Sequence, residues 1–267
     1  MRALKVPANY GAAWIRCGFD VVRRDPVHWF GMTLVYFVIG LALKQLPFVG
    51  DLLIILVTPL LLSGALLSLR ERTDAAMEDP AVPVAPAPLP AGRQWLDRLI
   101  LNPTRTLFQT TGREEYLFPA IMVCILGLGM IMITGIMEYL LTGGSIVTGL
   151  AASPLAAPLG VGLVSRMLVL VALYVLLLMA LLYLLPLSLF EGLPPMTAVA
   201  ESFAACRGNA GAVATFVGAF LVPSIIIMFI FALWRWLGYV LVFTVGLLAL
   251  PVFVAGVWCS YRALYRP

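Results

Sequence analysis

Charged residues are scarce in this sequence. Only 11% of its 267 residues are Asp, Glu, Lys or Arg, whereas about 25% is usual in soluble domains. Hydrophobic residues make up 62% of the chain, and the mean hydropathy is +1.03. This balance excludes an ordinary soluble domain and predicts a protein embedded in a membrane.

The side chains that usually bind cofactors or catalyse reactions are also few. His28 is the single histidine, which excludes a haem held by two histidines of one chain and leaves any His-based metal site dependent on a second subunit. We interpret His28 as an interfacial residue beside Trp29. No G-x-S-x-G motif is present, and no charge falls near the middle of an expected span. We therefore predict no cofactor, no metal and no enzymatic activity.

The four cysteines are Cys17, Cys124, Cys206 and Cys259, and no two of them form a C-x-x-C pair. With the topology predicted below, three lie at or near the cytoplasm and Cys124 lies within the membrane. Disulfides are rare in the cytoplasm, so none is expected.

Six apolar stretches approach or exceed the roughly 20 residues that a spanning helix needs. They cover approximately residues 27–45, 51–69, 117–141, 165–190, 211–234 and 237–261. The sequence therefore predicts an all-α polytopic membrane protein with six transmembrane helices, which places both termini on the same side.

The cationic residues predict the orientation. With a cytoplasmic N-terminus, only Lys44, Arg166 and Arg235 of the 17 Lys and Arg residues lie outside, a strong positive-inside bias. The first thirty residues lack the apolar core of a signal peptide. We predict a multi-pass protein with cytoplasmic termini whose net charge of +4 reflects topology and contact with membrane lipids rather than nucleic acid.

The segments between spans divide the chain into six parts. Residues 1–26 and 191–209 are expected to hold amphipathic helices in the membrane interface. Residues 71–116 contain a proline-rich linker and another short interfacial segment. The uncharged outer loop 142–164 separates the third and fourth spans and is either re-entrant or flat on the surface. The remaining parts are the spans themselves, at 27–70, 117–190 and 210–267.

Several proline and glycine positions are predicted to direct assembly of the helices. Pro194 and Pro195 reset the chain direction, and a short helix opens at Thr197 or the residue beside it. Arg207 points to headgroups or loops, and Gly208 with Asn209 is expected to stop that helix by allowing a left-handed backbone. Gly211 and Gly218 belong to a small-residue ridge suited to close packing, within the bundle or against a partner.

An internal repeat is visible in two outside-to-inside spans. Residues 58–70 align without gaps to residues 250–262 and match in four positions, namely Pro59 with Pro251, Gly64 with Gly256, Ser68 with Ser260 and Arg70 with Arg262. This match indicates a parallel duplication. The prolines are expected to kink both spans.

Three stretches carry a family resemblance: VPANYGAAWIRCGFDVVRRDPVHW near the N-terminus, PLSLFEGLPPMTAVAESFAACRGN at the elbow and LPVFVAGVWCSYRALY near the C-terminus. Together they resemble a family of six-helix bacterial inner-membrane proteins that has no assigned reaction. The elbow is also loosely similar to the membrane domains of some glycerophosphodiester phosphodiesterases. The resemblance implies a six-helix fold in a bacterial cytoplasmic membrane, without an activity.

Two functions are compatible with these observations. The first is a non-enzymatic structural or accessory subunit that packs against another membrane protein or a second copy of itself, or shapes the surrounding lipid. The alternative is a transporter or permease for an apolar or lipid-like substrate, which needs no buried charge. A cofactor-binding subunit is disfavoured because His28 has no second histidine.

Overall fold

The computed structural model describes residues 3–47, 49–78, 97–142 and 161–265. The fold is 90% helical, with no strand among the described residues, which confirms the all-α class. The elements in chain order are α1 (Tyr10–Arg24), α2 (Pro26–Lys44), α3 (Gly50–Glu78), η1 (Asp97–Leu101), α5 (Asn102–Phe108), η2 (Gln109–Gly112), α6 (Glu114–Thr142), α8 (Val161–Leu181), α9 (Leu184–Phe190), α10 (Pro195–Gly208), α11 (Ala210–Leu233) and α12 (Arg235–Tyr265).

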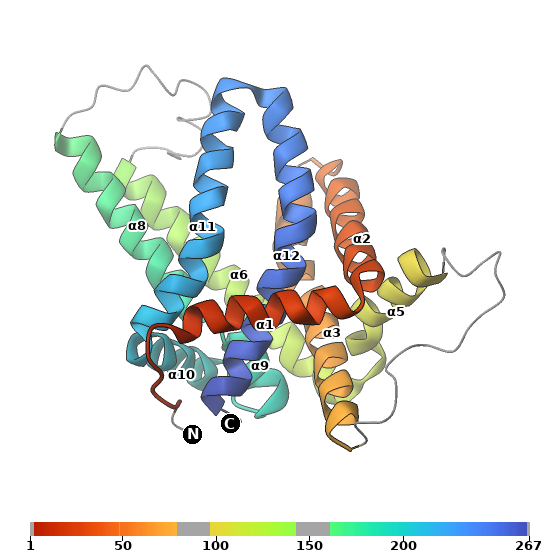
Figure 1. The fold of residues 1–267 in the computed structure, drawn as a ribbon. Coiled ribbons are helices and arrows are strands. Elements are labelled where there is room, and N and C mark those ends of the chain that lie inside the picture. The colour runs from red at the N-terminus through yellow and green to blue at the C-terminus, as the bar shows by residue number, and fades with distance from the viewer. Residues whose placement is uncertain (1–2, 48, 79–96, 143–160, 266–267) are drawn as a thin grey trace.

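The described residues contain six helical spans that are long and apolar enough to cross a membrane, as predicted. The fourth of them runs through α8 into α9. Most of the predicted proline-rich linker and of the outer loop lies outside the described residues, at 79–96 and 143–160. The chain is thus a multi-pass membrane protein whose termini lie close together at one end (Figure 1).

The helices form three consecutive units, each with a short helix followed by a pair of spans. Hairpin 1 consists of α2 and α3, hairpin 2 of α6 with α8 and α9, and hairpin 3 of α11 and α12. We call α1, α5 and α10 the base helices, and the end of the molecule where they and both termini lie the base (Figure 1). The internal repeat found in the sequence lies in the first and third of these units, and the second unit was not recognised as a copy.

Each base helix packs on the hairpin that precedes its own, in a cyclic order. Helix α5, with η1, packs on α2 and α3, while α10 packs on α8 and α9. Helix α1 closes the cycle because it lies across α11 and α12, at the other end of the sequence. Every hairpin is therefore held at the base by a helix from the next unit.

Glycines allow two of these base helices to approach their hairpins closely. A methyl group on Gly18 of α1 would lie 2.6 Å from the Val252 carbonyl oxygen and 2.8 Å from the Gly256 nitrogen. In hairpin 1, a methyl group on Gly64 would collide with the Leu107 carbonyl oxygen of α5. Backbone-to-backbone packing of this kind is common between membrane helices.

The buried core lies toward the base. Its largest fully buried side chains include Tyr183, Tyr261, Phe216, Leu187 and Leu264. Away from the base the hairpins are largely uncovered: 11% of the most apolar stretch of Ala210–Phe231 is buried, against 56% for Val171–Phe190. The hairpins are therefore fixed at one end and exposed at the other.

Two expectations about the base are wrong. A disulfide joins Cys17 to Cys259, whose Cα atoms are 6.3 Å apart, because α1 crosses α12 and brings together residues separated by 242 positions. Gly208 does not end α10 with a left-handed backbone. The helix includes Gly208 and is followed by Asn209 at φ −125°, and the positive-φ glycine among the described residues is Gly192, at φ +62°.

Candidate functional site

Ser202 of α10 forms hydrogen bonds with backbone groups at the break between α8 and α9. Its hydroxyl oxygen accepts a hydrogen bond from the Tyr183 N–H at 3.0 Å and donates one to the Met179 carbonyl oxygen at 2.7 Å. The break leaves these backbone groups without ordinary helical partners, and unpaired polar groups are costly when buried. Ser202, which is fully buried, thereby fixes α10 to hairpin 2.

Replacement of Ser202 by alanine is expected to destabilise the protein by about 1–3 kcal/mol, because the Tyr183 N–H and the Met179 carbonyl lose a buried partner. Thermal melting of the detergent-solubilised protein measures the effect. The matched control is Ser224→Ala, since Ser224 is exposed and bonds to Phe220 in its own helix. An equal loss of stability in both variants would contradict the role of Ser202.

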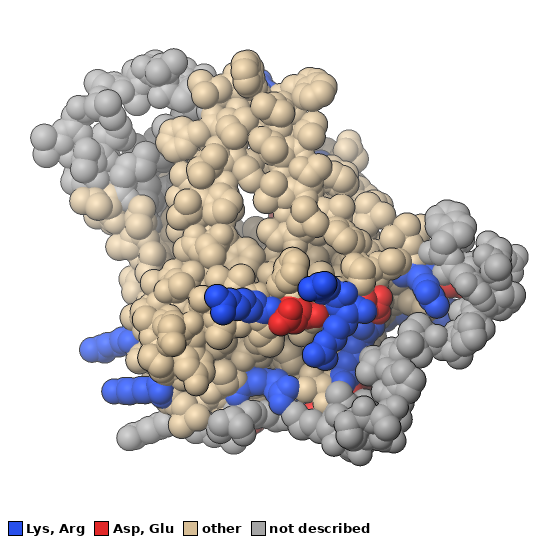
Figure 2. All heavy atoms as spheres, viewed as in Figure 1, with Lys and Arg blue, Asp and Glu red and all other residues tan. Residues whose placement is uncertain are grey.

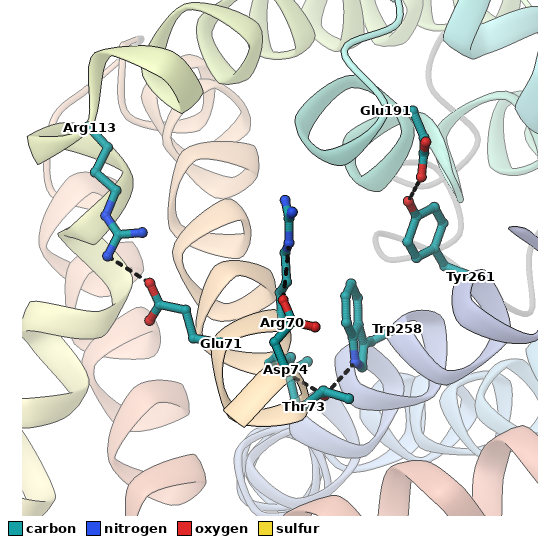
Figure 3. Close-up of polar contacts among 9 residues, drawn as sticks. Arg70, Glu71, Thr73, Asp74, Arg113, Glu191, Trp258 and Tyr261 are labelled. Atoms are coloured by element: carbon teal, nitrogen blue, oxygen red, sulfur yellow. Dashed lines mark hydrogen bonds and ion pairs between the residues drawn. The ribbon is translucent and has the colours of Figure 1, made fainter. Parts of the chain in front are cut away.

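Polar contacts around the base end of α3 connect the three hairpins (Figure 3). From α3, Glu71 forms an ion pair at 2.6 Å with Arg113, which directly precedes α6, and Arg70 lies 5.2 Å from the Phe190 ring of α9. Thr73 of α3 accepts a hydrogen bond from Trp258 Nε1 of α12 at 3.4 Å. The Tyr261 hydroxyl of α12 donates a hydrogen bond to Glu191, which directly follows α9.

Aromatic side chains join hairpins 2 and 3 at the same level. The ring centroids of Tyr183 and Tyr265 are 6.4 Å apart, and Phe190 lies 5.3 Å from Trp258 and 5.9 Å from Tyr261. Edge-to-face pairs such as Phe190–Trp258 each add about 0.5–1.5 kcal/mol beyond their burial. Together with α10, these rings close the interface between hairpins 2 and 3 at the base.

Beyond the rings this interface is open. Within the described ranges, neither α6 nor α8 makes more than marginal contact with α11 or α12, and α8 and α11 lie apart toward the far end (Figure 1). Residues 221–226 of α11 are all exposed, as are 174–176 of α8. We call these uncovered stretches the open interface. The other two pairs of hairpins do meet, through α3 with α6 and through α12 with α2 and α3.

The open interface is apolar. Leu221 is 53% exposed, Ile226 53% and Leu176 48%, and neither stretch contains an ionisable residue other than Tyr174. The charged side chains instead gather at the base, in a band along α1 (Figure 2). The open interface therefore suits apolar matter, such as acyl chains or another membrane helix.

The predicted elbow residues lie around α10. Pro194 precedes the helix and Pro195 is its first residue. Arg207 is exposed, and a side chain added at Gly208 would meet nothing within 4 Å. The structure thus places Pro194 and Pro195 where α10 turns toward hairpin 2, and Arg207 at the surface of the base.

The predicted residues of the spans fall into two groups. Pro59 and Pro251 lie inside continuous helices, and Pro251 lines a small apolar cavity between α2, α3 and α12. Gly256 contacts Phe216 and the Trp14 backbone, and a methyl group added at Gly211 would lie 3.1 Å from the Ala8 side chain. A methyl group added at Gly218 would meet nothing within 4 Å. The structure therefore places Gly256 beneath α1 and Gly211 beside the segment that precedes α1, and it leaves Gly218 without a close neighbour among the described residues.

Asn209 is a structural residue that sequence reasoning treated only as part of a helix stop. Its side chain accepts a hydrogen bond from the Val6 N–H at 2.8 Å and donates to the carbonyl oxygens of Leu4 and Ala205, each at 3.0 Å. It is 3% exposed and holds the N-terminal segment against the α10–α11 junction. A polar residue at the start of an apolar span was the signal available in the sequence.

His28 is buried at the start of α2, with its ring against Trp29. Within the ranges that the structure describes, no group of three or more His, Cys, Asp or Glu residues is placed to hold a metal ion. The contacts described at the base are packing, hydrogen bonds, ion pairs and the Cys17–Cys259 disulfide.

The fold and the open interface define the class, an α-helical multi-pass membrane protein. No protein-family model, curated protein or solved structure matches the chain. Membership of the six-helix bacterial family accordingly stays a prediction from the three resembling stretches.

Proposed function

We propose that the protein is a non-enzymatic accessory subunit of a membrane complex, and that a membrane-embedded partner occupies the open interface. The single observation that supports this proposal is the incomplete cycle of hairpins. Among the described residues, two of the three interfaces between hairpins are formed within the chain, and contacts across the third lie at the base. A partner helix between α8 and α11 would complete it.

The small residues of α11 favour a helical partner. Gly218 has no atom near the position of an added methyl group, and Ala214, one turn earlier on the same helix, is exposed. Small residues let membrane helices approach closely, which is the main source of packing energy between them. The exposed small residues of α11 are thus available to a partner helix.

The orientation and compartment belong to the same proposal. The arginine-bearing base would face the cytoplasm of a bacterium, with the far ends of the hairpins at the outer side of the inner membrane. The band of Lys and Arg along the base (Figure 2) is the feature that supports this orientation, because cytoplasmic loops are enriched in these residues.

A permease for an apolar or lipid-like substrate is the second candidate. The bulky aliphatic side chains of the open interface, such as Leu176, Leu221 and Ile226, suit acyl chains. Pro223 lies inside α11 at this level and removes one helical hydrogen bond, which favours bending. A substrate of this class would enter sideways from the lipid.

Site-specific photo-crosslinking separates the two candidates. Benzoylphenylalanine is placed at Leu176 or Leu221 in the open interface, or at Leu41 as a matched control. Leu41 is 57% exposed on α2, away from this interface. The full-length protein is irradiated in its native membranes, and the adducts are identified by mass spectrometry.

A protein adduct of one defined mass at Leu176 and Leu221, but not at Leu41, is the result expected for an accessory subunit. An adduct with a second copy of the chain would identify that copy as the partner and the complex as a homo-oligomer. Enrichment of phospholipid adducts at the same two positions would support the permease instead. Identical adducts at all three positions would overturn both proposals for the open interface.

A further inference from the structure

The Cys17–Cys259 pair lies at the surface of the base, where α1 crosses α12. Cys17 is exposed and Cys259 is half-buried, so the rest of the protein leaves the bond uncovered on the Cys17 side. The other two cysteines, Cys124 and Cys206, are free and buried. The Cys17–Cys259 pair is thus accessible, whereas the thiols of Cys124 and Cys206 are buried.

The pair differs from the other cysteines in its exposure. Thiolates are the reacting species in thiol–disulfide exchange. Burial raises the thiol pKa of Cys206 to about 12, which disfavours its thiolate. Cys17 and Cys259 instead lie nearer the surface.

The location of the bond also matters. Structural disulfides are uncommon on a face exposed to the reducing cytoplasm, and the base carries the arginines that the positive-inside rule assigns to that side. A bond at this place therefore encounters small thiols, and an exposed bond is open to exchange with them.

We propose that Cys17 and Cys259 form a reversible thiol–disulfide exchange site that latches α1 to α12, with glutathione-like small thiols and their disulfides as the reactants. This inference rests on the proposed cytoplasmic orientation of the base, and it does not depend on what occupies the open interface.

Opening of the bond takes two small thiols. The first thiolate attacks the exposed Cys17 sulfur and forms a mixed disulfide, while Cys259 leaves as a thiolate and takes up a proton. A second small thiolate attacks the small-molecule sulfur of that mixed disulfide and releases Cys17. The small thiols are oxidised to one disulfide as the protein disulfide gains two electrons, and closure of the latch is the reverse reaction.

Opening the latch would loosen part of α1 without detaching the helix. The N-terminal side of α1 stays anchored, because Asn209 binds Leu4 and Val6 and Gly11 packs on α11. The C-terminal side continues directly into α2. Reduction should therefore loosen the middle and second half of α1, around residues 17–24, rather than unfold the protein.

The test uses full-length protein in its native membranes, equilibrated with glutathione and glutathione disulfide at a series of ratios. The protein is denatured in N-ethylmaleimide, which blocks every free thiol, including the buried Cys124 and Cys206. It is then reduced, and the newly released thiols are labelled with a maleimide-polyethylene glycol that shifts the band on a gel. The controls are Cys17→Ser and Cys259→Ser, together with Cys124→Ser and Cys206→Ser.

The expected result is a doubly labelled band that rises with the disulfide fraction and falls again when glutathione is restored. This band should disappear in Cys17→Ser and in Cys259→Ser and persist in the Cys124 and Cys206 variants. A pair that stays oxidised in excess glutathione, or stays reduced in excess disulfide, would overturn the proposal. Both outcomes are read on the wild-type chain, so they do not depend on the folding of a variant.

Hydrogen exchange supplies a second measurement on the wild-type protein. Reduction is expected to speed amide exchange in residues 17–24 by about tenfold, because local opening becomes easier when a tether is removed. Exchange in α10, which contacts neither cysteine, serves as the internal control. Unchanged exchange in α1 after complete reduction would overturn the latch.

Discussion

Replacement of Gly18 by leucine is expected to be among the most destabilising single changes in this protein, at about 3 kcal/mol. The new side chain would meet the Val252 carbonyl oxygen and the Gly256 backbone. These are backbone atoms of a helix and cannot rotate away as a side chain can. The expected consequence is separation of α1 from hairpin 3, read as a lower melting temperature of the solubilised protein.

Gly135→Leu is the matched control for Gly18→Leu. Gly135 is exposed on α6 and has nothing within 4 Å of an added methyl group, so leucine there should change the melting temperature little. Equal destabilisation of both variants would show that any large residue in place of a helical glycine is harmful. It would contradict a specific contact between α1 and α12.

Replacement of Asn209 by alanine is expected to cost about 3 kcal/mol, because the Val6 N–H and the Leu4 carbonyl would lose their partner at a buried position. Asn209→Asp should be no milder, since a carboxylate would face the carbonyl oxygens of Leu4 and Ala205 without a proton to donate. The melting temperature of the solubilised protein again measures both changes.

Asn9→Ala is the control for Asn209→Ala. Asn9 precedes α1, is exposed, and makes no side-chain capping bond, so its loss should lower stability by no more than about 0.5 kcal/mol. If Asn9→Ala and Asn209→Ala melt at the same temperature, the N-terminal segment is not held by Asn209.

The six spans were predictable because long apolar runs report helix length directly. The α1 segment was equally readable, since Trp14 and Gly18 fall on one helical face and Arg16, Arg23 and Arg24 on another. The cyclic packing of base helices could not be read in this way. Gly18 and Gly256 meet through space, and nothing in their local sequences states which hairpin each base helix covers.

The open interface was beyond the sequence for a different reason. In a membrane, a leucine that faces lipid and a leucine that faces another helix look the same, because both surroundings are apolar. Leu221 is 53% exposed, whereas Leu187 is fully buried, and no feature of either local sequence separates them. The disulfide was not predicted because the cysteines were assigned to a reducing compartment, and the contact between α1 and α12 cannot be read from the sequence.

The cyclic packing of the base helices also determines when contacts can form during synthesis of the chain. Helix α1 leaves the ribosome early, yet its docking site on α12 includes Cys259, 242 residues later. Translation at about 5–20 residues per second separates the two events by tens of seconds or less. Until then α1 has no hairpin to cover and must wait at the membrane surface. Helix α12 is therefore made after α1 and secures it.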